Sequence, residues 1–380
     1  MKASKVACLE KPRSTMVISS STPFFNLNVS DNKMWYNLFN TMIKSRITTL
    51  NDVAALAGVS HQTVSRVVNG HPSVSKKALE RVQKAINELN YQPNSAARHL
   101  ATQRSKVIGV VSYGLIHYGP AQLLTSFEQA AQVRGYGLSN VNVNDLTFEE
   151  ISRAIQSLRR QRVDGIILFA PLVNIEQTHL EQICADLPLV MTDAEPQAGR
   201  YVTIIDQFTG GRLAAQHLLG LGHKQIALIT GPLDWYAAIL RHQGWQSVLQ
   251  QARIEAVATI ESDWTHAGGY RATLQLLESG VSFTALLVAN DHMALGALRA
   301  MHERGVSLPQ DVSVVGFDDA PEAAYLEPPL TTIRQDFSTR AQQGLDQLIA
   351  QIENPADSHQ LTMLVPELIV RESTAPPRPQ

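Results

Sequence analysis

The sequence predicts two folded units: an all-α helix-turn-helix unit near the N-terminus and a larger α/β unit made of two lobes. Three observations favour this division. The length of 380 residues exceeds what one hydrophobic core usually serves. A basic segment with short, capped helical patterns precedes residue 107. Beyond it, short apolar runs alternate with amphipathic stretches, which is typical of parallel sheets covered by helices on both faces.

Composition narrows the class of protein. The chain is 44% hydrophobic and 17% charged with a net charge of −2, as in an ordinary globular protein. The two cysteines, Cys8 and Cys184, are too far apart for a disulfide framework or a clustered metal site, so we expect a cytoplasmic protein with no metal and no cofactor. The sequence shows neither an apolar run that could span a bilayer nor a secretory signal, so we expect no membrane partner.

The first segment with a regular pattern covers residues 46–92. Residues 1–45 show no sustained helical or strand period and are predicted to be a disordered extension. Residues 46–106 carry nine basic and three acidic side chains, a net charge of +6, which favours a phosphate backbone as partner. The alternative for such a charge run alone is a solvated helical face.

Capping residues place three helices in this segment. Thr49 followed by Asp52 forms a variant of the capping box, and Gly58 ends the first helix. Ser60 caps a second helix over residues 61–69, and its inward side is expected to carry Val64, Val67 and Val68. Ser75 caps a third helix with one apolar side, formed by Leu79, Val82, Ile86 and Leu89.

Two helices that meet through a glycine-containing turn are typical of a helix-turn-helix. The outward face of the second helix carries compact hydrogen-bonding groups that suit base edges and phosphates in a major groove. We therefore predict DNA contacts for the cap and this face: Ser60, His61, Gln62, Thr63, Ser65, Arg66 and Asn69. Many helical hairpins bind proteins instead, but charge, caps and polar face together favour DNA.

Residues 93–105 join the two units. They contain helix-forming residues in a stretch too short to be stable alone, and they carry less Gly, Ser and Pro than a plain linker would. We expect a hinge that folds only under some conditions. The larger domain then extends over residues 106–373, and residues 374–380 form a tail where three prolines exclude a helix.

In the larger domain, polar residues follow the predicted strands. About 265 residues of alternating strands and helices exceed one doubly wound unit, which predicts two lobes with a ligand cleft at the strand ends. Asp193, Asn290, Asp291, Asp318 and Asp319 follow apolar runs, and Arg241 lies in the helix after another. Such groups suit sugar hydroxyls, and Trp264 and Phe337 could pack on a sugar ring. Singly, each aspartate is as well explained as an N-cap and each aromatic as core.

The segment from residue 48 to 105 also resembles the headpiece and hinge of the lactose repressor family, LacI/GalR. The runs DVA, AGVS, TVSRV and LNYQPN occur in one order with uninterrupted spacing. The resemblance implies that His61, Gln62 and Arg66 read the operator bases. It also implies that two hinge helices form on DNA, that Asn94 and Ala97 contact it, and that Leu100 is wedged into the minor groove.

The resemblance continues through the larger domain, in the runs QRVDGIIL, LVANDHMALGALRA, DVSVVGFDD and PPLTTIRQDF. It implies a periplasmic-binding-protein-like, Rossmann-like effector domain and a homodimer. The implied sugar contacts are Asp193, Arg241, Trp264, Asn290, Asp318, Gln335 and Phe337. The family pattern is not followed at residues 112–120, Phe169, Ala237 and His292. These departures leave open which sugar binds.

The function implied is a repressor of a sugar-utilisation operon, for lactose or another β-galactoside, that leaves its operator when the sugar binds. Such a repressor works in the cytoplasm and associates with the nucleoid when it is bound to the operator. Two alternatives have the same fold. The repressor could respond to a different sugar, or it could need a corepressor that strengthens operator binding instead of releasing it. A solute-binding protein is disfavoured by the headpiece, and an enzyme by the lack of catalytic motifs and of metal-ligand spacing among the histidines.

Overall fold

The structure is a computed structural model that describes residues 48–68, 71, 73–91, 104–169, 171, 183–184, 187–194, 201–354 and 361–379. The chain divides into two compact units, Met1–Asn94 and Ser95–Gln380. The expected extension (residues 1–45) and most of the expected hinge (residues 93–103) lie outside the described residues. The predicted fold class is confirmed, with a small helical unit and a larger α/β unit.

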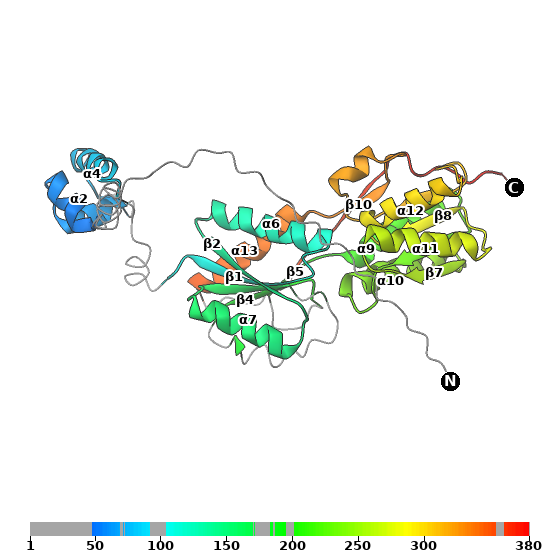
Figure 1. Cartoon of the computed structure of the whole chain (residues 1–380), viewed down its shortest axis with the longest axis horizontal. Helices are drawn as coiled ribbons and strands as arrows, with labels where there is room; N and C mark the ends of the chain where they lie inside the picture. The colour runs from blue at the N-terminus through cyan, green and yellow to red at the C-terminus, as the bar shows by residue number, and fades with distance from the viewer. Residues whose placement is uncertain are drawn as a thin grey trace, which may run out of the picture. The chain divides into compact units, whose positions relative to one another are not determined.

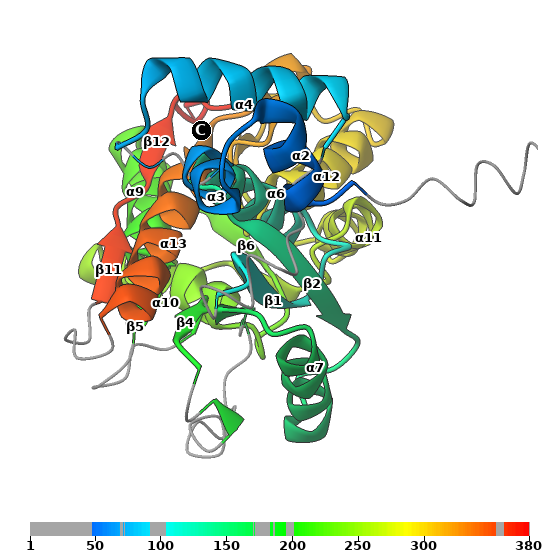
Figure 2. The same cartoon turned by 90° about the vertical axis from the view of Figure 1, so that its left-hand side faces the viewer.

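The first unit contains three described helices, α2 (Leu50–Ala57), α3 (His61–Val68) and α4 (Lys76–Glu88), which Figure 2 shows. Its caps are the predicted ones. The Thr49 side chain accepts from the backbone N–H of Asp52, the Asp52 carboxylate accepts from the backbone N–H of Thr49 at 2.8 Å, and Gly58 ends α2 in the left-handed conformation. Ser75 caps α4 in the same way through the N–H of Ala78. Local sequence therefore fixes where these helices begin and end.

The core of this unit forms around Val53, Val64 and Val82, which are fully buried. The prediction for α4 was wrong at Leu79, whose side chain is 44% exposed. Ala85 is buried instead, and Tyr91 beyond the end of α4 joins the core. The apolar pattern missed these two residues because alanine is a weak hydrophobic marker and Tyr91 lies outside the helix.

The first lobe of the larger unit is built on a six-stranded sheet in the order β11-β5-β4-β3-β1-β2, and every pair in it is parallel. Alternate residues of its central strands point to opposite faces. Ile166 and Leu168 pack toward α7 (Phe148–Arg160), whereas Ile167 and Phe169 pack toward α6 (Tyr118–Val133) and α13 (Phe337–Glu353). Figures 1 and 2 show α13 and α7 on opposite sides of the sheet. The strands are β1 (Val107–Tyr113), β2 (Gly137–Val143), β3 (Gly165–Phe169), β4 (Leu189–Thr192), β5 (Tyr201–Ile205) and β11 (Leu361–Leu364).

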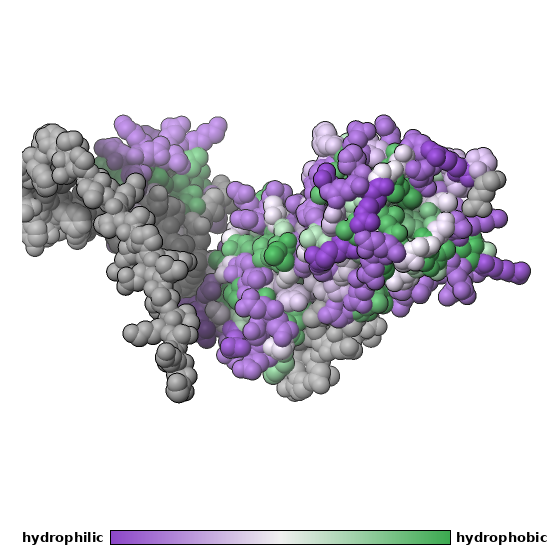
Figure 3. Space-filling model, turned by 45° about the vertical axis from the view of Figure 1, so that its right-hand side comes forward, coloured by the Kyte–Doolittle hydropathy of each residue, from purple (hydrophilic) through white to green (hydrophobic). Residues whose placement is uncertain are grey.

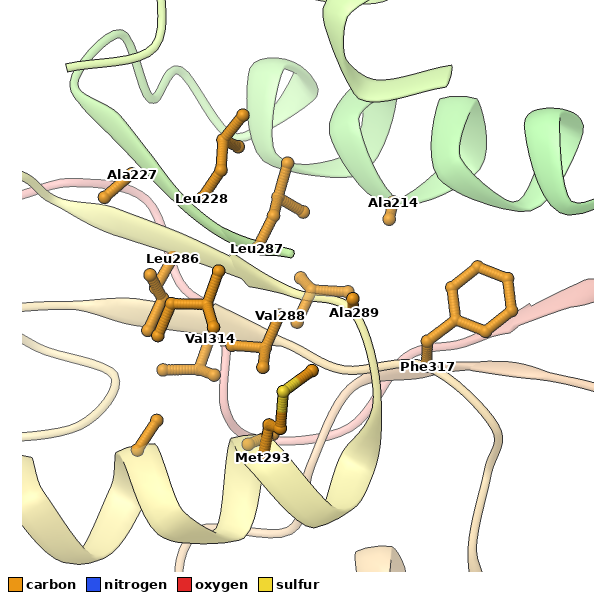
Figure 4. Packing of buried hydrophobic residues seen from close by; sticks show 14 of the residues in the cluster. Ala214, Ala227, Leu228, Leu286, Leu287, Val288, Ala289, Met293, Val314 and Phe317 are labelled. Carbon is orange, nitrogen blue, oxygen red and sulfur yellow. The ribbon is translucent and has the colours of Figure 1, made fainter. Parts of the chain in front are cut away.

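The second lobe has a parallel four-stranded sheet in the order β7-β6-β8-β9. Ala214 of α9 and Met293 of α12 point into its core from opposite sides (Figure 4). The strands are β6 (Ile226–Thr230), β7 (Ala258–Glu261), β8 (Ala285–Val288) and β9 (Ser313–Val315). The helices are α9 (Gln207–Gly220), α10 (Tyr236–Gln251), α11 (His266–Glu278) and α12 (Asp291–Glu303).

The last part of the chain ties the lobes together. After the short helix η1 (Pro321–Tyr325), β10 (Thr332–Arg334) pairs antiparallel with β12 (Glu367–Ile369), and between them α13 and β11 return to the first lobe. The expected tail is not separate, because the backbone N–H of Ala375 donates to Ser313 of β9 at 3.0 Å and Arg378 pairs with Asp311 at 2.8 Å. In the part of the chain that the structure describes, no helix is long and apolar enough to cross a membrane.

Close helix contacts in the second lobe depend on glycine. A Cβ at Gly211 of α9 would overlap the backbone carbonyl oxygen of Arg241 in α10, and one at Gly244 of α10 would overlap that of Phe208 in α9. In α11 and α12, Gly269 and Gly296 face each other's helices with the same lack of space. In both pairs, the two helices are therefore as close as their backbones allow. The contact at Gly211 fixes the distance between α9 and the backbone of Arg241.

We predict that Gly211→Ala lowers the free energy of unfolding by about 1–3 kcal/mol, because the added methyl group must separate α9 from α10. Urea unfolding of the full chain measures this loss. Gly220→Ala in the same helix is the matched control, since a Cβ there meets nothing within 4 Å, and it should leave the midpoint unchanged or raise it. Equal midpoints for the two variants would contradict the packing described.

Candidate functional site

In the first unit, the candidate site is the outer face of α3. Val64 anchors this helix in the core, while His61, Gln62 and Arg66 are exposed. Thr63 and Ser65 are half-buried, and Ser60 is engaged as a cap because its hydroxyl accepts from the backbone N–H of Thr63 at 3.2 Å. Four further residues predicted to contact DNA lie outside the described residues, namely Asn69, Asn94, Ala97 and Leu100.

In the larger unit, one cavity is lined by residues of both lobes. The structure brings all seven predicted effector residues to this one cavity: Asp193, Arg241, Trp264, Asn290, Asp318, Gln335 and Phe337. Asp193 follows β4 of the first lobe, whereas Arg241 comes from α10 and Asp318 from the turn after β9 in the second lobe. A molecule in the cavity would therefore meet polar groups from both lobes.

Four buried polar side chains form a closed ring on the wall of the cavity. Arg241 donates through Nε to Oε1 of Gln207 at 2.8 Å, and Gln207 donates to Oε1 of Gln335 at 2.8 Å. Gln335 donates to Oδ1 of Asp318 at 2.6 Å, and Nη2 of Arg241 lies 3.5 Å from the same oxygen. Arg241 also donates to the backbone carbonyl of Ala289. Each member fixes the next, so the ring is rigid.

Burial dominates the electrostatics of this ring. The pKa of Asp318 is raised to about 6, chiefly because its carboxylate is buried, while Arg241 and the hydrogen bond from Gln335 act in the opposite direction. Burial also lowers the pKa of Arg241, and Asp318 opposes that shift. The guanidinium lies 3.8 Å from the ring centroid of Phe317, a cation–π contact. The cation is therefore held by one carboxylate, two carbonyl oxygens and an aromatic face.

The first lobe contributes a second buried cation. Arg340 of α13 is 1% exposed, and its Nη2 lies 2.9 Å from Oδ1 of Asp193 and donates to the hydroxyl of Thr192. Its Nε donates to the backbone carbonyl of Thr203 at 3.3 Å. Since the Asp193 side chain keeps 20% of its surface exposed, it can still accept hydrogen bonds from a molecule in the cavity.

Asn290 lines the cavity while its side chain serves the second lobe. Its Oδ1 accepts from the backbone N–H of Met293 at 2.8 Å and caps α12, and its amide donates to the backbone carbonyl of Trp264 at 3.1 Å. The interpretation of Asn290 as an N-cap is therefore correct. It does not exclude a contact to a sugar, because the amide oxygen has a second lone pair.

Backbone strain gathers at the same cavity. Asp193, Trp264 and Asp318 have φ values of 61°, 66° and 116°, a region that residues other than glycine rarely adopt. Such conformations persist only where the surrounding structure holds them, and they cluster at binding sites. The hydrogen bonds of Asp193 and Asp318 described above provide that support.

Aromatic groups form the apolar wall. Trp235 lies edge-on to Trp264 with ring centroids 5.8 Å apart, and His117 lies edge-on to Trp235 at 5.4 Å. Tyr118 also lines the cavity and lies edge-on to Phe337 at 6.1 Å. Apolar faces and polar groups in one cavity suit a sugar, since its ring carries both C–H and O–H groups.

Four lining residues were missed from the sequence, namely Gln207, Arg340, Trp235 and Pro171. Tyr118, Gly119 and Pro120, which also line the cavity, belong to the segment 112–120 noted above. Gln207 and Arg340 lie in helices rather than at strand ends, and only their burial as polar groups marks them, which no sequence pattern shows. His117 and Ala237, which depart from the family pattern, also line the cavity.

Other residues considered from the sequence do not line the cavity. Phe169 is 1% exposed and packs on Phe127 in the core of the first lobe. Asp291 is buried, it accepts from Thr332 at 2.6 Å and from the backbone N–H of Ala320 at 2.8 Å, and burial raises its pKa. Asp319 pairs instead with Arg334 and Arg371. Strand-end position alone did not separate these carboxylates from Asp318.

Comparison with known proteins gives family matches in both units. Residues 49–94 match the lacI family of bacterial regulatory proteins, and residues 215–374 match the periplasmic binding protein-like domain. The lactose operon repressor of Escherichia coli K12 is 40% identical over 87% of this chain and 92% of its own length. The ribose operon repressor of the same strain is 34% identical over 86% of this chain and its full length.

Among solved structures, the lac repressor dimer bound to operator and the anti-inducer ONPF superposes with a TM-score of 0.79 at 39% identity. The match covers 87% of this chain and all of that one. The match thus spans the headpiece and both lobes of this chain. The chain belongs to the lacI family of bacterial regulatory proteins and is a DNA-binding transcriptional repressor, not an enzyme.

Proposed function

We propose that this repressor controls a sugar-utilisation operon and that a β-galactoside binds in the cavity as its inducer. The observation that carries the proposal is the polar ring of Arg241, Gln207, Gln335 and Asp318, faced by Asp193 from the other lobe. Similarity to the lactose operon repressor and to its structure with ONPF supports the choice of sugar.

The mechanism follows from the two-lobed site. A ligand shifts a conformational equilibrium only by its different affinity for the two states, so the inducer must prefer the lobe arrangement that releases DNA. A sugar bonded to Asp193 on one lobe and to Arg241 and Asp318 on the other would fix how the lobes sit. That arrangement would unfold the hinge segment, withdraw Leu100 from the minor groove and free the operator.

We propose further that α3 reads operator DNA in the major groove, with base contacts from His61, Gln62 and Arg66. Ser60, Thr63, Ser65 and Asn69 would contact the same groove, and Asn94, Ala97 and Leu100 of the hinge the adjacent DNA. One headpiece covers half of a pseudo-palindromic site, so a homodimer would bind the whole operator. The protein would work in the cytoplasm, at the nucleoid when bound to DNA.

A different sugar is the second candidate. His117 and Ala237 both line the cavity and both depart from the family pattern, so they change its wall. The similarity to the ribose operon repressor favours testing a pentose beside the galactosides.

We predict that Arg241→Ala leaves operator binding intact and abolishes induction. The variant loses a charge-assisted hydrogen bond to sugar hydroxyls, which contributes about 1.5–3 kcal/mol. Operator binding with and without galactosides measures the effect.

Because Arg241→Ala leaves Asp318 buried without its cation, Arg241→Lys is the companion variant, which keeps the charge but loses the planar fork. Arg299→Ala in the same lobe, where the side chain is 64% exposed, is the control and should respond like the parent. Normal release of Arg241→Lys by galactosides would place the sugar elsewhere. Release of the parent by ribose alone would select the second candidate.

We predict that Arg66→Ala and Gln62→Ala weaken operator binding by about 1–3 kcal/mol each and weaken binding to random duplex less, because base contacts carry the specificity. Fluorescence anisotropy at fixed salt with both duplexes measures the two losses. Gln83→Ala on the exposed side of α4 is the matched control and should change neither. An equal loss for operator and random duplex would contradict base reading by α3.

We predict a dimer in solution, with twice the chain mass of 41.8 kDa, by light scattering at micromolar concentration. The surface offers apolar groups for such an interface, because Tyr325 is 87% exposed and Figure 3 shows hydrophobic residues gathered over part of the second lobe. A stable tetramer or a stable monomer would contradict this prediction.

A further inference from the structure

Three potential metal ligands meet on the second lobe, outside the lining of the cavity. His266 is the first residue of α11, His292 is the second residue of α12, and Glu322 lies in η1. The two helix N-termini are held together by the glycine contact described above, since a Cβ at Gly296 would overlap the backbone carbonyl oxygen of His266. The fold, rather than any short motif, brings these residues together.

The distances fit a site that closes with small side-chain rotations. One ligand atom of each residue lies within 4.8 Å of the other two, and Nε2 of His292 is 3.1 Å from Oε1 of Glu322. The two imidazole rings stack with centroids 4.2 Å apart. Ligands about 2.0–2.1 Å from a tetrahedral zinc ion lie about 3.4 Å from one another. His266 is exposed and can rotate to close the remaining gap.

The chemistry of the set selects the ion. Two imidazoles and one carboxylate are ligands of zinc and similar transition metals, whereas calcium and magnesium require oxygen ligands. Three protein ligands leave a fourth position for water or another donor. Tyr118, which lines the cavity, packs edge-on against His292 at 5.5 Å, so the cluster lies beside the cavity wall.

We propose that His266, His292 and Glu322 bind a divalent transition-metal ion, with zinc as the favoured ion. This is the only cluster of three such ligands among the residues that the structure describes. The long separations in sequence, at 266, 292 and 322, explain why the spacing of the histidines indicated no metal site.

The test is zinc binding by the full chain, purified without a histidine tag and stripped of metal with a chelator. Equilibrium dialysis against micromolar zinc followed by elemental analysis should give one ion per chain. His266→Ala, His292→Gln and Glu322→Gln should each weaken binding by about tenfold or more, because each removes one ligand. Cobalt in place of zinc should give visible absorption in the parent, and that absorption should be lost in the histidine variants.

His302→Gln is the matched control, since His302 is an exposed histidine at the other end of α12, and it should bind zinc like the parent. Melting temperatures in chelator show that the variants remain folded. Failure of the parent to bind zinc at micromolar concentration, or unchanged affinity in either folded histidine variant, would overturn the proposal.

Discussion

The wall of the cavity depends on one buried cation. Arg241 is 5% exposed, and an unpaired charge at such a depth would cost several kcal/mol. The positive charge of Arg241 is compensated by Asp318, which follows β9. The N–H groups of Arg241 donate to Gln207 at the start of α9 and to the backbone carbonyl of Ala289 after β8. Three segments far apart in sequence must therefore meet at one point, and the cavity wall is formed where they meet.

Close helix packing and strained backbone occur beside the same cation. Gly211 lets α9 approach the backbone of Arg241 itself. Asp318 has a φ of 116°, and its carboxylate is held by Gln335 and Arg241. Packing and strain thus place polar groups before any ligand arrives, which reduces the cost of binding.

Much of this could be predicted from the sequence, and the remainder has physical reasons. Caps at Thr49 and Ser75 and the apolar runs of the strands are local signals, so the helices and the parallel sheets were predicted correctly. Strand-end position and aromatic character predicted six of the seven cavity residues, and resemblance to the family added Gln335. Gln207 and Arg340 were missed because a buried polar side chain is marked only by tertiary contacts. For the same reason, strand-end position alone did not separate Asp318 from Asp291, and only the resemblance to the family favoured Asp318.

The cavity between the lobes is the proposed sugar site, and tryptophan fluorescence tests this assignment directly. Trp235 and Trp264 both line the cavity, so titration with a β-galactoside should change the emission in a saturable way. The change should be reduced in Trp264→Phe, with the same midpoint for operator release and for the fluorescence signal in the parent. No saturable change with any galactoside, or an unaltered change in Trp264→Phe, would contradict the account.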